Sequence, residues 1–190
     1  MPDVSFTTLT ICGIEELPAH NKRAVTNVLT ILDPGRDDPE AFLAFEPHER
    51  TILRFHDIIA PEDNRTLPQQ DHMDQILRFG SINSTSGKGG HLLVHCHMGI
   101  SRSTAAMLTL MAQGNPNASA EALFQRLAEI RPQAWPNSLM VRFADDMLGY
   151  KGELVEELGR HYGRQLEKNP LYREWMAKLG RGQEVEMAIL

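Results

Sequence analysis

The feature that most constrains the fold is a short apolar run that leads, through a brief loop, into a strong helix-forming segment. The run is His91–Cys96 (HLLVHC), the loop is residues 97–103 (HMGISRS) and the helical segment is residues 104–113 (TAAMLTLMAQ). A continuous apolar run of strand length is typical of a strand buried on both faces, as the strands of parallel sheets are. The segment therefore predicts a β-strand, a tight loop and a helix that returns across the sheet.

Further strands are predicted before this segment, and further helices around it. Alternating and β-branched residues predict strands over residues 7–14, 24–32 and 51–55. The predicted helical elements are a turn over residues 41–45, a helix from Pro68 that ends in a connection over residues 80–90, a helix capped by Ser119 and a helix over residues 138–148. Strands that alternate with helices indicate an α/β fold, with a central, mainly parallel sheet flanked by helices.

Residues 151–190 are charged and helical in character, and no convincing linker precedes them. We expect residues 1–150 to form the main domain and this segment to be a helical C-terminal extension of the same domain. The expected interruptions are Gly159, Gly163 and Asn169-Pro170. Residues past Gly180 are expected to be flexible. The stretch Lys151–Lys168 is most simply a solvated helix face, and a helix that docks a partner is the alternative.

Composition excludes several classes of partner. The chain has 190 residues, a formal net charge of -6 and a pI near 5.7, which argues against binding to duplex nucleic acid. No apolar run is long enough to span a bilayer, and the first residues lack the early Lys or Arg and the long apolar core of a secretory signal. Two cysteines are too few for a disulfide framework. We therefore expect a cytoplasmic protein with reduced thiols, no membrane partner and an undetermined oligomeric state.

The loop after His91–Cys96 has the composition of an anion-binding site. Ligands of parallel sheets lie beyond the carboxyl ends of the strands, where this loop begins. Its amide groups can turn inward, and the following helix adds the positive end of its dipole. Gly99 permits a backbone conformation that a side chain opposes, and Arg102 offers a planar fork for two phosphate oxygens. The predicted phosphate-binding residues are His97, Met98, Gly99, Ile100, Ser101 and Arg102.

Cys96 stands where a nucleophile would face an anion bound in this loop. The helix start and the neighbouring cation favour its thiolate form, and the hydroxyl of Ser103 or Ser101 could hydrogen-bond the sulfur. A thiolate can attack phosphorus in line and form a phosphocysteine intermediate, which water then hydrolyses. Positioning and electrostatic stabilisation dominate such phosphoryl transfer.

Three segments of the chain resemble the protein tyrosine phosphatase superfamily. HCxxGxxRS at His95–Ser103 resembles its signature, and GISRS is similar to the dual-specificity branch. LRFHDI before a Pro-bearing loop and EIRPQAWPN after the signature helix resemble further segments of these enzymes. The resemblance covers residues 25–148. It implies a cysteine-dependent protein tyrosine or dual-specificity phosphatase that acts on a phosphorylated protein and needs neither metal nor organic cofactor.

A leaving oxygen needs a proton, which a nearby carboxyl group can supply. The candidates upstream of Cys96 are Asp57, Glu62 and Asp63. Asp57 closes the strand over residues 51–55, which is where the acid of the family lies, so we favour it. Asp63 is the alternative, because its separation from Cys96 in the sequence is also similar to that in the family.

Other interpretations of the same residues remain open. The chain could be a catalytically silent module that docks a phosphorylated partner, or the fold could act on a nucleotide, an RNA 5′-end or an inositol phosphate. Sulfur transfer is a further alternative, although such loops differ in their spacing to the arginine. A metal site at His95, Cys96 and His97 is not expected, because successive residues of a strand point to opposite faces. Cys12 is expected to be a buried hydrophobe, with a thiol that protects oxidised Cys96 as the alternative.

Overall fold

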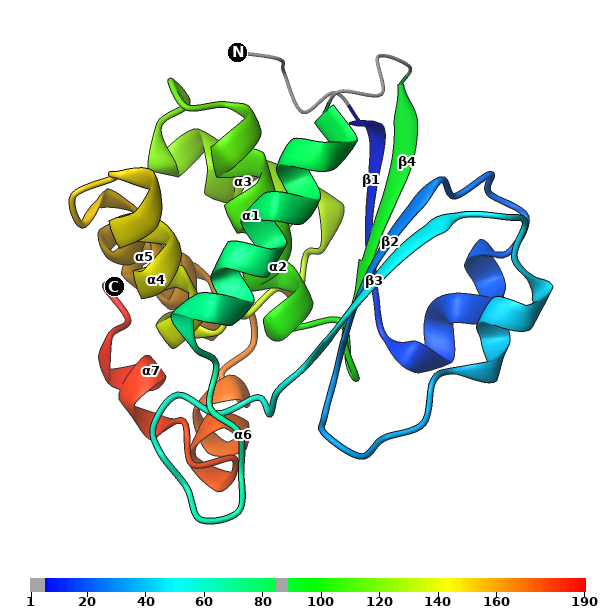
Figure 1. Ribbon diagram of the computed structural model, residues 1–190. Coiled ribbons are helices and arrows are strands. Elements are labelled where there is room, and N and C mark those ends of the chain that lie inside the picture. The colour runs from blue at the N-terminus through cyan, green and yellow to red at the C-terminus, as the bar shows by residue number, and fades with distance from the viewer. Residues whose placement is uncertain (1–5, 85–88) are drawn as a thin grey trace.

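A computed structural model describes residues 6–84 and 89–190 of the chain, and its centre is a parallel sheet (Figure 1). Within these residues the sheet has four strands in the order β1-β4-β2-β3, and every neighbouring pair is parallel. The strands are β1 Phe6–Cys12, β2 Asn27–Leu32, β3 Glu49–Arg54 and β4 Gly90–His95. The predicted α/β class and the predicted strands are confirmed, with ends that move by a few residues.

The α-helices cover one face of the sheet, and two short 3₁₀ helices cover the other (Figure 1). The elements on the first side are α1 Gln70–Ser84, α2 Arg102–Gly114, α3 Ala120–Ile130, α4 Ser138–Leu148, α5 Glu153–Lys168, α6 Tyr172–Lys178 and α7 Gly182–Glu186. The 3₁₀ helices are η1 Ile14–His20 and η2 Glu40–Ala44. No helix in the described residues combines the length and the apolar character that a membrane crossing requires.

The two faces of the sheet bury separate apolar cores. The larger core lies between the sheet and the α-helices and contains Leu92 and Val94 of β4. The smaller core contains Leu93 of the same strand, Val28 of β2 and Leu17 of η1. β4 is therefore apolar on both faces, and so is β2, whose Leu29 and Ile31 belong to the larger core.

Strand register brings three carboxyl ends to one edge of the sheet. In β4, His95 is level with Cys12 of β1 and with Thr30 of β2. Cys96 follows directly, so it leaves the sheet at the point where the chain turns into the loop before α2. This is the edge at which parallel sheets place their ligands.

Helix α1 runs into the region where a connection was predicted. The prediction that the helix ends at Gly80 is wrong: α1 continues to Ser84, and residues 85–88 of the predicted connection lie outside the described residues. A Cβ atom at position 80 would lie 2.8 Å from Leu110 Cδ2 of α2 and would also overlap Gln113. The glycine thus allows two helices to pack closely, which is a different use of the residue from ending a helix.

The two glycines of α5 also do not interrupt it. The helix is continuous from Glu153 to Lys168, and Ile189 lies against Gly159 and Gly163. The amide of Ile189 donates to the carbonyl of Gly159 at 2.9 Å, and a Cβ atom at Gly163 would lie 2.9 Å from the carbonyl carbon of Ile189. The predicted break at Asn169-Pro170 is confirmed, because α5 ends at Lys168.

The expectation of a flexible tail past Gly180 is also wrong. The segment folds into α7, and both Arg181 and Glu184 are buried, with 2% and 0% of their surface exposed. Charged residues are mostly exposed in folded proteins, whereas these two are buried as a mutual ion pair at 2.7 Å.

Candidate active site

Cys96 lies at the base of a cavity of about 330 Å³ that opens over the loop between β4 and α2. Cys96 is only 2% exposed, yet it lines this cavity together with Arg102 and Asp57. The Sγ atom lies 3.1 Å from Ser103 Oγ. Of the two serines considered for this contact, Ser103 makes it, whereas Ser101 donates instead to Asp57 Oδ1 at 2.7 Å.

The loop is held by donors that reach its carbonyl groups from outside. The carbonyls of residues 97–100 accept hydrogen bonds from the amide of Ile14, from two nitrogens of Arg131 and from the amide of Trp135, at 2.8–3.2 Å. Within the described residues, the amides of residues 97–101 donate to no protein group. Outward carbonyls leave the amides to face inward, which is the arrangement of an anion-binding nest.

Arg131 is a support of the loop that sequence reasoning did not identify individually. Its Nη1 and Nη2 donate to both carboxylate oxygens of Glu16, at 2.9 and 2.7 Å, while Nε donates to the Gly99 carbonyl at 2.9 Å. The hydrogen bond from Arg131 lowers the pKa of Glu16 below its ordinary value. Since a bidentate pair fixes the plane of the guanidinium, Glu16 orients the donor that holds the loop.

Gly99 is the tightest position of the loop. Its φ angle is +68°, and a Cβ atom there would lie 2.5 Å from the amide nitrogen of Gly13 and 2.6 Å from the carbonyl oxygen of Cys12. A side chain at this position is therefore opposed both by the backbone conformation and by the end of β1.

We expect Gly99→Ala to lower the free energy of unfolding and to weaken the binding of inorganic phosphate. The backbone conformation alone costs about 1–3 kcal/mol for a non-glycine residue, and displacement of the loop adds to it. Gly35→Ala is the matched control, because Gly35 has a φ of +79° but no atom within 4 Å of its Cβ position. Urea denaturation and phosphate inhibition measure both effects. Equal losses in the two variants would contradict the close approach of the loop to β1.

Arg102 is buried at the start of α2 and lines the cavity over Cys96. Its Nη1 donates to Asp33 Oδ1 at 2.6 Å and also to the carbonyl of Phe55. Its Nε is buried and has no partner within the described residues, so this donor remains available to an oxyanion. Asp33 was not predicted. It follows β2, the neighbour of β4, so the sheet order brings it to the same edge as Cys96.

Asp57 is the carboxylate that lies closest to the loop among the three predicted candidates. Its Oδ1 accepts from Ser101 Oγ and from Asn137 Nδ2 at 2.7 and 3.0 Å, and its Oδ2 lies 3.1 Å from Arg181 Nη1. Burial acts to raise the pKa of Asp57, but the two arginines Arg181 and Arg102 and the two hydrogen bonds hold it below its ordinary value. Without a bound substrate, Asp57 is therefore a carboxylate.

The other two candidate acids, Glu62 and Asp63, do not line the cavity over Cys96. Glu62 pairs with Arg65 at 2.8 Å and lines the wider mouth of the site, a cavity of about 600 Å³. Asp63 is exposed, and it lines neither this mouth nor the cavity over Cys96. The geometry therefore favours Asp57 over Asp63 as the proton donor.

The histidines around the loop have different surroundings. His95 shares a hydrogen bond with Thr30 Oγ1 at 2.8 Å, and burial lowers its pKa to about 4, so the ring is neutral at pH 7. His91 bonds through its two ring nitrogens to Thr10 and to the Arg23 carbonyl. His97 is exposed and lines the mouth of the site.

Cys12 is fully buried at the end of β1, and both cysteines are free. Burial raises the pKa of the Cys12 thiol to about 12, with the Glu16 carboxylate as the next cause. The thiol is therefore protonated at pH 7 and belongs to the smaller core. A protective role towards oxidised Cys96 stays a prediction.

One wall of the cavity over Cys96 comes from α6, which sequence reasoning did not connect with the site. The lining residues from this segment are Tyr172, Trp175, Met176 and Leu179. Tyr172 stacks on the buried Trp135 with ring centroids 5.0 Å apart, and Trp135 stacks on Tyr162 of α5 at 4.2 Å. The charged extension after residue 150 thus supplies an apolar wall to the site.

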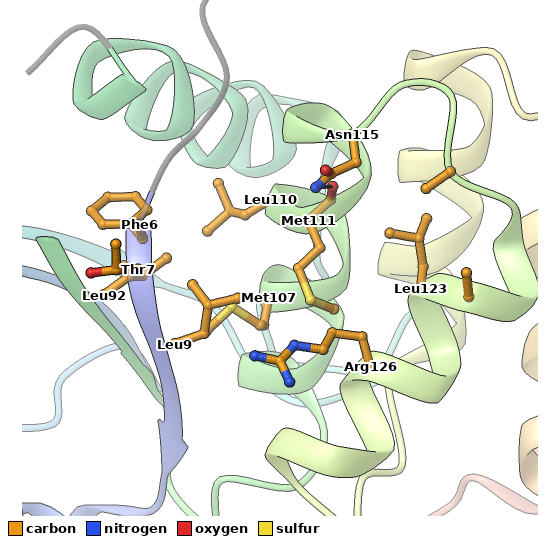
Figure 2. A pocket seen from close by; sticks show the side chains of 12 residues that line it. Phe6, Thr7, Leu9, Leu92, Met107, Leu110, Met111, Asn115, Leu123 and Arg126 are labelled. Carbon is orange, nitrogen blue, oxygen red and sulfur yellow. Dashed lines mark hydrogen bonds between the residues drawn. The ribbon is translucent and has the colours of Figure 1, made fainter. Parts of the chain in front are cut away.

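A second cavity, of about 490 Å³, lies on another part of the molecule (Figure 2). Side chains of β1, α2 and α3 line it, among them Leu9, Met107, Leu123 and Arg126. None of the predicted site residues lines it. The predicted catalytic residues Asp57, Cys96 and Arg102 line the cavity over Cys96 instead.

Comparison with known proteins identifies similar chains and similar folds. No protein-family model matches the chain. Over 94 residues, which are 50% of this chain and 13% of the relative, it is 34% identical to human protein phosphatase Slingshot homolog 3. Human DUSP28 superposes with a TM-score of 0.56 at 17% identity, over 79% of this chain and 99% of that one. PTP-2 phosphatase of Cydia pomonella superposes with a TM-score of 0.58 at 17% identity, over 77% of this chain and 90% of that one. The likeness to these solved structures shows that the chain has the fold of the dual-specificity and tyrosine phosphatases.

Proposed function

We propose that the chain hydrolyses phosphomonoesters through a phosphocysteine intermediate. The observation that carries this proposal is the set of unpaired donors around Cys96. The amides of residues 97–101, in the loop that follows Cys96, and the buried Nε of Arg102 are used by no protein acceptor in the described residues. Donors held in this way match the equatorial oxygens of a phosphoryl group in transfer.

The reaction proceeds in two displacements at phosphorus. In the first, the thiolate of Cys96 forms the S–P bond while the P–O bond of the ester breaks, and the leaving oxygen takes a proton from the carboxyl group of Asp57. In the second, a water molecule attacks phosphorus and gives a proton to the Asp57 carboxylate. The S–P bond breaks, and inorganic phosphate and the Cys96 thiolate are released.

The walls of the cavity favour an aryl phosphate, and we propose phosphotyrosine in proteins as the substrate. The apolar side chains of α6 lie beside the loop, where the ring of a phosphotyrosine would pack. Two cations at the mouth, Arg65 and Lys178, are each paired with a glutamate, at 2.8 and 2.5 Å. Little unpaired positive charge is therefore left for a polyphosphate or an inositol polyphosphate.

The proposed partner is thus a phosphorylated protein, and the proposed compartment is the cytoplasm. Two free cysteines, one of them the nucleophile, suit a reducing environment. A phosphoserine side chain is shorter than phosphotyrosine and would make fewer contacts with α6, so we expect it to be the poorer substrate.

Rapid mixing with p-nitrophenyl phosphate tests the proposal. We expect a burst of nitrophenol followed by slower steady turnover, and a phosphoryl group on the peptide that contains Cys96 after acid quenching. Two peptides of identical sequence, one with phosphotyrosine and one with phosphoserine, then compare kcat/KM. Tight phosphate binding without any turnover would contradict the proposal and leave the silent docking module.

A further inference from the structure

Arg181 is a charged side chain that is buried beside the candidate active site. Only 3% of its side chain is exposed, and it follows Ser101 by 80 positions in the sequence. Its Nη1 donates to Ser101 Oγ at 2.7 Å and lies 3.1 Å from Asp57 Oδ2. One edge of the guanidinium therefore faces both the phosphate-binding loop and the candidate acid.

Glu184 holds the opposite edge of this guanidinium. Arg181 donates to its two carboxylate oxygens through Nε and Nη2, each at 2.9 Å. The same carboxylate accepts from Trp135 Nε1 at 2.7 Å and from the amide of Ser138 at 2.8 Å, and Glu184 is fully buried. A buried ion pair with this many satisfied partners is rigid, so Arg181 has one available orientation.

Asp57 is consequently fixed on both of its oxygens. Neutral donors, Ser101 and Asn137, hold Oδ1, whereas the cation Arg181 holds Oδ2. We infer that Arg181 is a positioning residue for phosphoryl transfer, which orients the Asp57 carboxyl group towards the loop and sets the pH range in which it can donate a proton. This inference rests on the proposed function.

The contact between Arg181 and Asp57 hinders the first displacement and favours the second. A guanidinium favours the carboxylate, so Asp57 must take a proton from solvent before it can protonate a leaving group. The same carboxylate is ready to accept a proton from water in the second displacement. Because a phenol titrates near 10 and leaves more readily than an alkoxide, Arg181 biases the site towards aryl phosphates.

Several other ionisable groups surround Asp57, and they come from different elements. They are Cys96, His97 and Arg102 at the loop, Asp33 after β2, Glu62 and Arg65 after β3, Tyr162 on α5, Lys178 on α6, and Glu184 behind Arg181. All except Glu184 are unchanged when Arg181 and its partner are replaced. A change in the titration of Asp57 can then be assigned to the Arg181–Glu184 pair.

The double variant Arg181→Met/Glu184→Gln tests the inference. Replacing Arg181 alone would leave a buried, unpaired carboxylate and destabilise the fold. The amide that replaces the Glu184 carboxylate is neutral. Trp135 Nε1 and the amide of Ser138 donate to different oxygens of Glu184, so the single oxygen of Gln keeps one of these two hydrogen bonds. The exposed pair Arg126–Glu129 on α3 has the same spacing and lies at 2.8 Å, so Arg126→Met/Glu129→Gln is the matched control.

Two measurements are made on each variant. The first is the carboxyl ¹³C titration of Asp57 in the phosphate-free protein, which requires no catalysis. The second is the basic limb of the pH profile of kcat/KM for phenyl phosphate, whose leaving group needs a proton. In Arg181→Met/Glu184→Gln we expect the midpoint of the Asp57 titration and the basic limb of the kcat/KM profile each to move upward by about 1–3 pH units. In the control variant we expect neither to move.

An unchanged titration and an unchanged limb in the folded double variant would overturn the inference, although turnover by the wild type would still support the proposed function. Absence of turnover by the wild type would instead defeat the proposed function, while the ¹³C titration would still report the contact. If the double variant does not fold, Arg181→Lys replaces it. Lysine keeps the charge but cannot bridge Glu184 and Ser101, so kcat should fall at least tenfold with phosphate inhibition retained; an unchanged kcat would contradict positioning.

Discussion

Cys96→Ser should reduce kcat for p-nitrophenyl phosphate by a factor on the order of 10⁴ or more, because a serine hydroxyl at this position has no base to activate it. Ser103 is the group that contacts the sulfur, at 3.1 Å, and it cannot remove a proton from another hydroxyl at neutral pH. Phosphate should still bind, since Arg102 and the loop amides are unchanged. Steady-state kinetics measure the first effect, and isothermal titration with inorganic phosphate measures the second.

Cys12→Ser is the matched control for this experiment. Cys12 is equally free and equally buried, but it lies in the smaller core and does not line the cavity over the loop. Its replacement should lower the free energy of unfolding by about 1–3 kcal/mol, because a hydroxyl is then buried. The kcat should stay within a few-fold of the wild-type value. Substantial turnover by Cys96→Ser would show that another group is the nucleophile.

Asp57→Asn should slow the hydrolysis of phenyl phosphate by about 10²–10⁴-fold, since an amide can neither donate the proton to the leaving oxygen nor accept one from water. The loss should be smaller in the first displacement of p-nitrophenyl phosphate, because nitrophenolate leaves without a proton. Binding of inorganic phosphate should change little. Measurement of kcat for both esters, with phosphate inhibition, separates these effects.

Asp63→Asn is the corresponding control. Asp63 is exposed and lines neither the mouth of the site nor the cavity, so its variant should retain kcat for both esters. A large loss in Asp63→Asn together with normal turnover in Asp57→Asn would transfer the acid role to Asp63. Such a result would require the loop after β3 to close over the cavity when substrate binds.

The sequence predicts those parts of the fold that depend on neighbouring residues. The apolar run before Cys96, the cap at Ser119 and the break at Asn169-Pro170 are local signals, and each has its expected place in the structure. Glycine is ambiguous in this respect, because it both ends helices and admits close neighbours. Only the packing of α1 on α2 shows that Gly80 has the second use.

The supporting residues of the site could not be predicted, because they are distant from Cys96 in the sequence. Asp33 and Arg181 belong to no sequence pattern that includes the loop, and each contacts it only after folding. Asn137 ends the segment EIRPQAWPN, but its hydrogen bond to Asp57 depends on the fold. Asp33 could have been found from the sheet order, since it follows a strand adjacent to β4. For Arg181 no such rule exists, since a single arginine in a charged segment looks like a solvated one.

The hydrogen bonds that hold the loop carbonyls in place have a consequence for how a bound anion affects stability. Chains gain stability when they pair their amides, but here Ile14, Arg131 and Trp135 hold the carbonyls of residues 97–100 so that the amides opposite them stay unpaired. These amides are therefore free to pair with a bound oxyanion. An oxyanion at a concentration one hundred times its Kd would add about 2.7 kcal/mol to the free energy of unfolding.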